Sequence, residues 1–181
     1  MKLKTLKILT LGALMVITIS AVAQKYEQPV LISSAGQSAD VKLVQMLVQR
    51  QKLDSKTVLM ATPDDLKGVK TLIIVPGFSS KGLGAAGVSQ QQEMERVKAL
   101  VSSANSLKIP IIMVHIGGNA RRQGQSDAFN KVVGENSKYM IVVRQGDEDG
   151  FFTEISKNLK LPLILVDKIS ETEAPIGVLF N

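Results

Sequence analysis

The amino-acid sequence predicts an α/β protein with three layers, in which a doubly wound, mainly parallel sheet of five or six strands lies between two layers of helices. Short apolar runs rich in β-branched residues alternate along the chain with longer segments whose apolar residues recur at helical spacing. Several of the short runs are apolar on both faces, as expected for strands that are covered on both sides by helices. Right-handed crossovers between such strands give a Rossmann-like or flavodoxin-like order.

Six short runs are predicted to be strands, and four longer segments are predicted to be helices. The strands are residues 29–33, 57–61, 71–75, 110–116, 140–143 and 163–166, the helices are residues 39–53, 89–107, 125–135 and 149–159, and residues 62–68 form at most one or two turns. In the second helix, five apolar residues between Met94 and Ala104 recur at helical spacing, with charged residues on the other face. Ser38 and Ser126 each end a Gly-Gln-Ser triplet, and we expect both to cap the helices that follow.

Residues 1–23 are predicted to be a secretory signal peptide, and residues 24–181 to be a single α/β domain. The signal features are three lysines, an apolar run and a small-residue cleavage site, namely Lys2, Lys4 and Lys7, then residues 8–19, then Ala21-Val22-Ala23. The apolar run is shorter than the roughly 20 residues of a membrane-spanning helix, so a retained membrane anchor is the weaker interpretation. We therefore expect a soluble exported protein, periplasmic or extracellular, that leaves the membrane after signal cleavage.

The composition argues against several classes of partner. The 181-residue chain has a formal net charge of +6, but three of its lysines lie in residues 1–23, which leaves +3 for the rest. The remaining basic and acidic residues are interspersed without a basic stripe, so we do not expect nucleic acid to be a partner. Because the chain has no cysteine, an aliphatic core must stabilise it without disulfides. The sequence gives no indication of a protein partner.

Four polar segments follow predicted strands and are expected to meet at one edge of the sheet, where ligands bind in this class of fold. They are residues 33–40, 76–87, 117–127 and 144–150. The second and third exceed the usual length of about 2–6 residues for such connections, which favours a functional surface. We expect this edge to bind a small polar or anionic molecule, with Arg121 and Arg122 able to clamp a carboxylate or phosphate. The candidate ligand contacts are Ser34, Gln37, Ser38, Ser79, Ser80, Lys81, Gly82, Gly84, Arg121 and Arg122.

The stretch SSKGLGAAGVS, residues 79–89, contains the Gly-x-Gly-x-x-Gly spacing of a dinucleotide-binding loop. Six residues separate the preceding strand from the first glycine, and no acidic residue ends the next strand, so the context argues against that interpretation. A P-loop is excluded as well, since Leu83-Gly84 stands where that motif requires Lys followed by Ser or Thr. We therefore predict no cofactor and a mobile loop, whose glycines permit close approach while Lys81 and backbone N–H groups meet an anion.

His115 is the only histidine, and it lies near the end of an apolar predicted strand. A histidine at such a position is commonly a packed, hydrogen-bonded residue, but it would also be well placed to act as a general base. The alternative function is therefore an envelope hydrolase or transferase that uses His115 as base with Asp127 or Asp147 nearby. The Gly-x-Ser-x-Gly element of α/β-hydrolases is absent from the sequence. A second alternative is a protein-interaction module without a small-molecule site.

No metal site is predicted. One histidine and no cysteine exclude the usual zinc cages. The run Asp147-Glu148-Asp149-Gly150 resembles part of a calcium loop, but Gln145 and Ser156 occupy the positions where that loop requires its first Asp and last Glu. These carboxylates are instead expected to stabilise the N-terminus of the helix that follows.

The stretches PVLISSAGQSAD, KTLIIVPGFSSKGLGAAG and IPIIMVHIGG resemble those of a family of exported bacterial domains of unknown function. Within them, the shared features are the GQSxD, SSKGLGAAG and HIGG segments. The resemblance covers most of residues 24–181 and implies an exported Rossmann-like domain. It implies no activity, so no catalytic residue can be transferred from the family.

Overall fold

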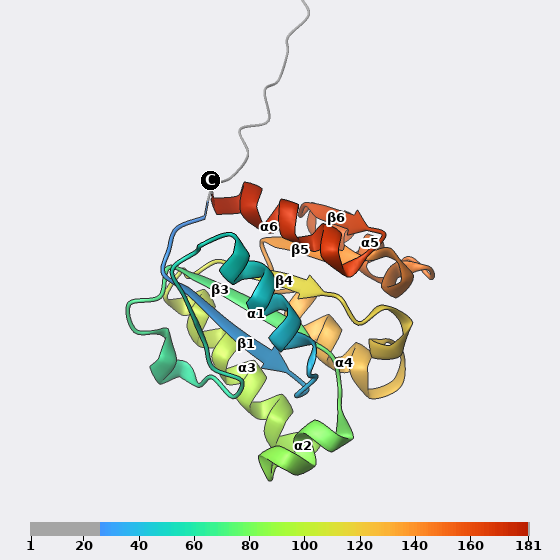
Figure 1. Ribbon diagram of the computed structural model, residues 1–181. Coiled ribbons are helices and arrows are strands. Elements are labelled where there is room, and N and C mark those ends of the chain that lie inside the picture. The colour runs from blue at the N-terminus through green and yellow to red at the C-terminus, as the bar shows by residue number, and fades with distance from the viewer. Residues whose placement is uncertain (1–25, 181) are drawn as a thin grey trace, which may run out of the picture.

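The computed structural model of the protein describes residues 26–180, which form a six-stranded parallel sheet between two layers of helices (Figure 1). The strand order is β2-β1-β3-β4-β5-β6, which confirms the predicted α/β class and is the flavodoxin-like order with a sixth strand added. The strands are β1 (Val30–Ala35), β2 (Ser55–Thr57), β3 (Thr71–Pro76), β4 (Ile111–His115), β5 (Tyr139–Val143) and β6 (Leu163–Val166). The predicted signal peptide, residues 1–23, lies outside the described residues.

Helices cover both faces of this sheet. The helices are α1 (Asp40–Arg50), α2 (Ser80–Ala86), α3 (Gln90–Ser106), α4 (Gly124–Gly134), α5 (Phe151–Leu159) and α6 (Glu173–Phe180). In Figure 1, α1 and α6 lie in front of the sheet, α3 and α4 lie behind it, and α2 lies beyond the end of β1. The chain therefore leaves β1 toward one face and β3 toward the other, as a doubly wound fold requires.

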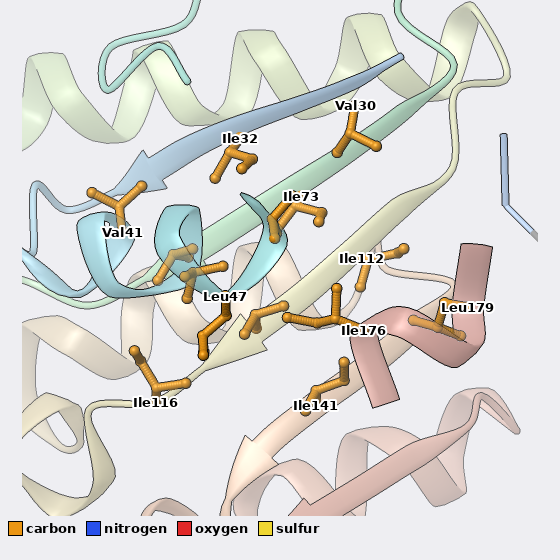
Figure 2. Close-up of a cluster of buried hydrophobic side chains, with 14 of the residues drawn as sticks. Val30, Ile32, Val41, Leu47, Ile73, Ile112, Ile116, Ile141, Ile176 and Leu179 are labelled. Atoms are coloured by element: carbon orange, nitrogen blue, oxygen red, sulfur yellow. The ribbon is translucent and has the colours of Figure 1, made fainter. Parts of the chain in front are cut away.

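An aliphatic core fills the space on each side of the sheet. Figure 2 shows the cluster under α1 and α6, where Leu47 and Ile176 pack with Ile73 of β3. The next residue of that strand, Ile74, points to the opposite face and belongs to the cluster that contains Phe129 of α4. Consecutive residues of the central strands are thus buried on opposite faces, which explains why these runs have apolar residues on both faces. Each large apolar side chain buried in this way contributes about 1.5–3 kcal/mol.

The predicted strand 57–61 is wrong in its extent. β2 covers only Ser55–Thr57, at the edge of the sheet, and the residues after it leave the ladder. The N–H of Val58 still donates to Ile32, and the N–H of Ala61 donates to the Ser33 hydroxyl, so this segment lies against β1 without forming a strand. An apolar run therefore marks burial against β1 here rather than regular pairing.

Two helices were not predicted. The glycine-rich stretch forms α2 rather than the predicted loop, and residues 173–180 form α6. Glycine disfavours helix formation by roughly 1 kcal/mol per residue, so local propensity argued against α2. Its start is nevertheless defined by Ser79, whose hydroxyl accepts the N–H of Gly82, and its end by Gly87 in the left-handed conformation.

The two predicted serine caps have different roles in the structure. The hydroxyl of Ser38 accepts the N–H of Asp40, so it satisfies a donor at the start of α1 from one position before the N-cap. Ser126 lies inside α4, and its hydroxyl accepts the N–H of Phe78 from the segment after β3. The prediction that Ser126 caps its helix is therefore wrong, because a contact distant in sequence uses that oxygen.

Candidate functional site

An open cleft of about 710 Å³ lies where the strand order reverses, between the segments that follow β1, β2 and β3. Ligands in doubly wound folds bind at this place, because the connections to the two helical layers diverge there. The lining includes Gln37 and Ser38 before α1, Leu59 and Met60 after β2, and Lys81 of α2. Three segments distant in sequence thus form one concave surface.

Close approach of two segments builds one wall of the cleft, and glycines permit it. Gln37 and Phe78 form an isolated antiparallel bridge between the segments after β1 and β3. A Cβ atom at Gly82 would lie 2.1 Å from the carbonyl oxygen of Gln37. Gly36 has a φ of +95°, and a Cβ there would lie 2.7 Å from the carbonyl oxygen of Gly77. The close approach predicted for the glycine-rich stretch is therefore confirmed at Gly82, whereas Gly84 and Gly87 have no neighbour within 4 Å of a Cβ position.

A buried ion pair holds this wall in place from behind. The carboxylate of Glu93 on α3 accepts the N–H of Gly36 at 2.9 Å and the side-chain N–H of Gln37 at 2.9 Å. Arg96, one turn further on, donates to both oxygens of that carboxylate at 2.8 Å. The same guanidinium donates to the carbonyl oxygens of Ser34, near the end of β1, and Ala61, after β2. One pair therefore fixes two of the three segments that form the cleft.

The structure brings five predicted contacts together and adds others. Five of the ten predicted ligand contacts line the cleft, namely Gln37, Ser38, Ser79, Lys81 and Gly82. The hydroxyl of Ser34 is buried and donates to Leu59, while Ser80 and Gly84 are exposed and do not line it. Lys42 on α1, Leu59 and Met60 also line the cleft and were not predicted from the sequence. Lys42 could have been found as the first basic residue of the helix after β1.

Arg121 contributes to the scaffold rather than to the cleft lining. Its guanidinium donates to the carbonyl oxygen of Phe78 at 3.0 Å and lies 3.5 Å from the carboxylate of Asp40. It thereby joins the start of α1 to the segment after β3. The aliphatic part of its side chain packs against Gly77 and Gly117, where a Cβ atom would lie 3.1 and 2.1 Å from it. These contacts engage Nη1 and Nε of the guanidinium, and Arg121 does not line the cleft, so its clamp on a ligand carboxylate or phosphate stays a prediction.

Arg122 is likewise occupied by protein groups. Its side chain is only 4% exposed, and it donates to the carboxylates of Asp127 and Asp149 and to the carbonyl oxygen of Gly146. The guanidinium also lies 4.4 Å from the centre of the Phe151 ring. These bonds use its donors and Arg122 does not line the cleft, so the ligand contact expected of it stays a prediction.

The three candidate catalytic residues are not assembled into one site. His115 is 0% exposed, and its Nε2 lies 3.1 Å from the carbonyl oxygen of Arg121, which can only accept a hydrogen bond. Its Nδ1 has no partner among the described residues and faces the backbone of Gly146. Asp127 pairs with Arg122, while Asp147 accepts the N–H groups of Phe152 and Thr153. His115 therefore has no carboxylate partner, and it does not line the cleft.

The contacts of Asp147 confirm the prediction that carboxylates of the 147–149 run stabilise the next helix. Its Oδ1 accepts the N–H groups of Phe152 and Thr153 in the first turn of α5 at 2.6 and 3.1 Å, and its Oδ2 accepts the hydroxyl of Thr153. Asp149 accepts the N–H of Phe151, the first residue of α5. This role at a helix start leaves the carboxylate little capacity to assist a base.

Because His115 is buried, we expect the free energy of unfolding to depend on pH. Burial lowers the pKa of His115, and the hydrogen bond to the Arg121 carbonyl opposes that shift. The folded protein then resists protonation while the unfolded chain accepts a proton below about pH 6.5. The contribution of neutral His115 to the free energy of unfolding should be fully present above pH 6.5. It should fall as the pH decreases toward the folded-state pKa, by at most about 1.4 kcal/mol per pH unit. Urea midpoints at pH 7.5, 6.5 and 5.5 test this, and an equal dependence in His115→Gln would contradict it.

Within residues 26–180, no group of three or more His, Asp or Glu side chains is arranged to hold a metal ion. The helices described are all too short or too polar to cross a membrane. A larger hollow of about 920 Å³ lies between α3 and α4, apart from the cleft, and nothing in residues 26–180 indicates what would cover it.

Fold and cleft together define a flavodoxin-like α/β domain with an open concave site at its switch point. By sequence, the chain belongs to the family described as a domain of unknown function (DUF6305), whose model matches residues 27–180. This confirms the resemblance to a family of unknown function. No curated protein matches the chain significantly by sequence.

Several solved structures are similar to this chain at low identity. A GDSL-like lipase from Bacteroides thetaiotaomicron is 11% identical with a TM-score of 0.33, and the match covers 75% of this chain but only 66% of the lipase, just under two thirds. A psychrotrophic esterase from Pseudoalteromonas is 15% identical with a TM-score of 0.31, over 76% of each chain. A putative acylhydrolase from Bacteroides fragilis is 10% identical with a TM-score of 0.35, over 80% of this chain and 72% of that one. These likenesses carry no conclusion about activity.

Proposed function

We propose that this protein is an exported binding domain that holds a small polar or anionic molecule in the cleft between α1 and α2. The observation that carries the proposal is the cleft itself, which lies at the switch point and is lined by residues from three separate segments. Its volume of about 710 Å³ falls within the range of known small-molecule sites, about 300–1,000 Å³.

The charge of the cleft supports an anionic ligand. Lys42 and Lys81 line it from opposite helices, and among residues 26–180 neither forms an ion pair. The hydroxyl oxygen of Ser79 accepts the N–H of Gly82, which leaves its own O–H available as a donor. Two ammonium groups and a hydroxyl therefore offer donors to a ligand, as anion recognition requires.

Thermal unfolding of the purified protein against carboxylates, phosphates, sugars, amino acids and nucleotides tests the proposal. A ligand at about 100 times its dissociation constant stabilises the native state by about 2.7 kcal/mol. For a protein of this size, each kcal/mol raises Tm by about 2–4 °C. We expect Lys81→Gln and Lys42→Gln each to weaken binding about tenfold, which would halve the shift at the same ligand concentration.

Lys157→Gln on α5 is the matched control, since this exposed lysine lies away from the cleft. It should leave the ligand-induced shift unchanged. The proposal fails if no member of the panel raises Tm, or if a stabilising ligand shifts both cleft variants as much as it shifts the parent protein.

Export is the second part of the proposal, and it rests on the features of residues 1–23. Expression of the full chain in a bacterial host should yield a protein that begins at Gln24, because the small residues Ala21 and Ala23 suit signal peptidase. Intact mass and N-terminal sequencing of the envelope fraction measure this. Uncleaved protein, or protein recovered only from the cytoplasm, would contradict export.

A further inference from the structure

We infer that the ligand of the cleft is an amphiphilic anion, in which one carboxylate or phosphate head is joined to a short apolar chain. This inference rests on the proposed binding function and names the class of molecule. It follows from the uneven distribution of charge and apolar surface over the lining of one concavity.

The apolar side of the cleft comes from the segment after β2. Leu59 is 41% exposed, and it lines the cleft beside Met60 and Val41. The small side chains of Ala85 and Ala86 on α2 complete this side. A single exposed leucine is ordinary on a protein surface, but apolar residues gathered in a concavity mark a binding site. Hydrocarbon placed there would leave water.

The side of the cleft that would hold the charged head of the ligand carries positive charge. Both charged residues of the lining are lysines, Lys42 and Lys81, and no acidic side chain lines the cleft among the described residues. The nearby carboxylate of Glu93 is already engaged by Arg96 and by the N–H groups of the wall. A cationic head would therefore meet uncompensated lysines, whereas an anion would be stabilised.

A hydrophilic polyanion or a sugar fits this surface poorly. Such molecules need several polar partners, and leaving their hydroxyl or carboxylate groups against Leu59 and Met60 would cost the hydrogen bonds that water provides. The volume of about 710 Å³ also exceeds what a bare anion fills. The lining thus matches a charged end and an apolar body in one molecule.

Calorimetric titration of the purified protein with butanoate, hexanoate and octanoate tests the inference, with octyl phosphate as a second head group and all ligands kept below micelle formation. Affinity should rise with chain length, by up to about fourfold for each methylene that is fully buried. Leu59→Asn should reduce this dependence of affinity on chain length, while Lys81→Gln should lower the affinity for every anion by a similar factor. Leu59 is suitable because its side chain is exposed, while its backbone oxygen keeps its bonds to Ser33 and Ser34.

Citrate and octylammonium separate the remaining outcomes. If citrate binds as tightly as octanoate and affinity does not depend on chain length, the inference of an amphiphilic ligand is wrong and the proposed binding function stands. If octylammonium binds as well as octanoate, the requirement for an anion is wrong. If no anion binds, this inference and the anionic form of the proposed function both fail. Binding of octanoate but not octyl phosphate, or the reverse, identifies the head group.

Discussion

Replacing Glu93 with alanine is expected to lower the free energy of unfolding by about 3–5 kcal/mol, the usual cost of removing one partner from a buried ion pair. The Glu93 side chain is 0% exposed and that of Arg96 only 10%, so the variant would leave a guanidinium without a counter-charge in a dry environment. The buried N–H of Gly36 would also lose its acceptor. Since small domains have about 5–15 kcal/mol of stability in total, the loss is large.

Urea unfolding at neutral pH measures this effect, and Glu95→Ala on the same helix is the matched control. Glu95 is exposed and accepts only an N–H of Gln91, so its removal should cost less than about 0.5 kcal/mol. In the double variant of Glu93→Ala with Arg96→Ala, the loss should be smaller than the sum of the two single losses, because no unpaired charge remains. A Glu93→Ala protein within 1 kcal/mol of the parent would contradict the role assigned to this pair.

A milder substitution of the same residue, Glu93→Gln, should affect ligand binding in the cleft. Glu93 is the acceptor for the side chain of Gln37, which lines the cleft, and it fixes the backbone at Gly36. We therefore expect any ligand that binds there to bind more weakly to Glu93→Gln than to the parent protein, since the amide presents only one acceptor oxygen to these donors. Glu93 thus acts as a positioning residue for the wall.

The fold was predictable because the strands carry their own signal. The central strands are buried on both faces, as the alternation of Ile73 and Ile74 between two cores shows. The edge strand β2 carried less signal, because only three residues pair and the apolar residues after them pack against β1. α2 was not predicted, since Gly82 and Gly84 oppose a helix locally, although contact with Gln37 requires glycine at position 82.

The candidate site was predictable only in part, because sequence shows residue types but not partners. Arg122 is a basic residue on the ligand-binding edge, yet Asp149, 27 positions later, is one of the groups that satisfy it. Glu93 was missed although it lies four residues before Val97 and so shares the buried face of α3. A carboxylate on a buried helix face, with an arginine three residues further on, is the signal that could have found it.

Replacing Arg122 with alanine is expected to lower the free energy of unfolding by about 3 kcal/mol at neutral pH, mainly by leaving Asp127 without its bidentate partner. Asp149 contributes less, because its side chain is 58% exposed and water can solvate it. The variant would also remove the donor to Gly146 and the cation over the Phe151 ring. This site joins the start of α4 to the turn before α5, so both helices should lose their fixed position.

The effect should depend on pH in a defined direction. Burial would raise the pKa of Asp127, but hydrogen bonds from Arg122 and Asn130 hold it below its ordinary value. The same guanidinium lowers the pKa of Asp149. A carboxyl whose folded-state pKa lies below its unfolded value of about 3.9 stabilises the protein fully above that pH, and this contribution is lost as the pH falls through the folded-state pKa.

Urea midpoints of the parent protein and of Arg122→Ala, measured at pH 7 and pH 3, therefore test the pairing of Arg122 with these carboxylates. The difference in stability between the two proteins should be smaller at pH 3 than at pH 7. Arg144→Ala is a matched control, since Arg144 pairs with Asp167 at 2.6 Å while their side chains are 57% and 67% exposed. An exposed pair of this kind should contribute less than about 1 kcal/mol at either pH. If Arg122→Ala and Arg144→Ala lower the free energy of unfolding by the same amount, Arg122 is not held in a buried ion pair. Its guanidinium would then be available to a ligand, as its place in the sequence suggested.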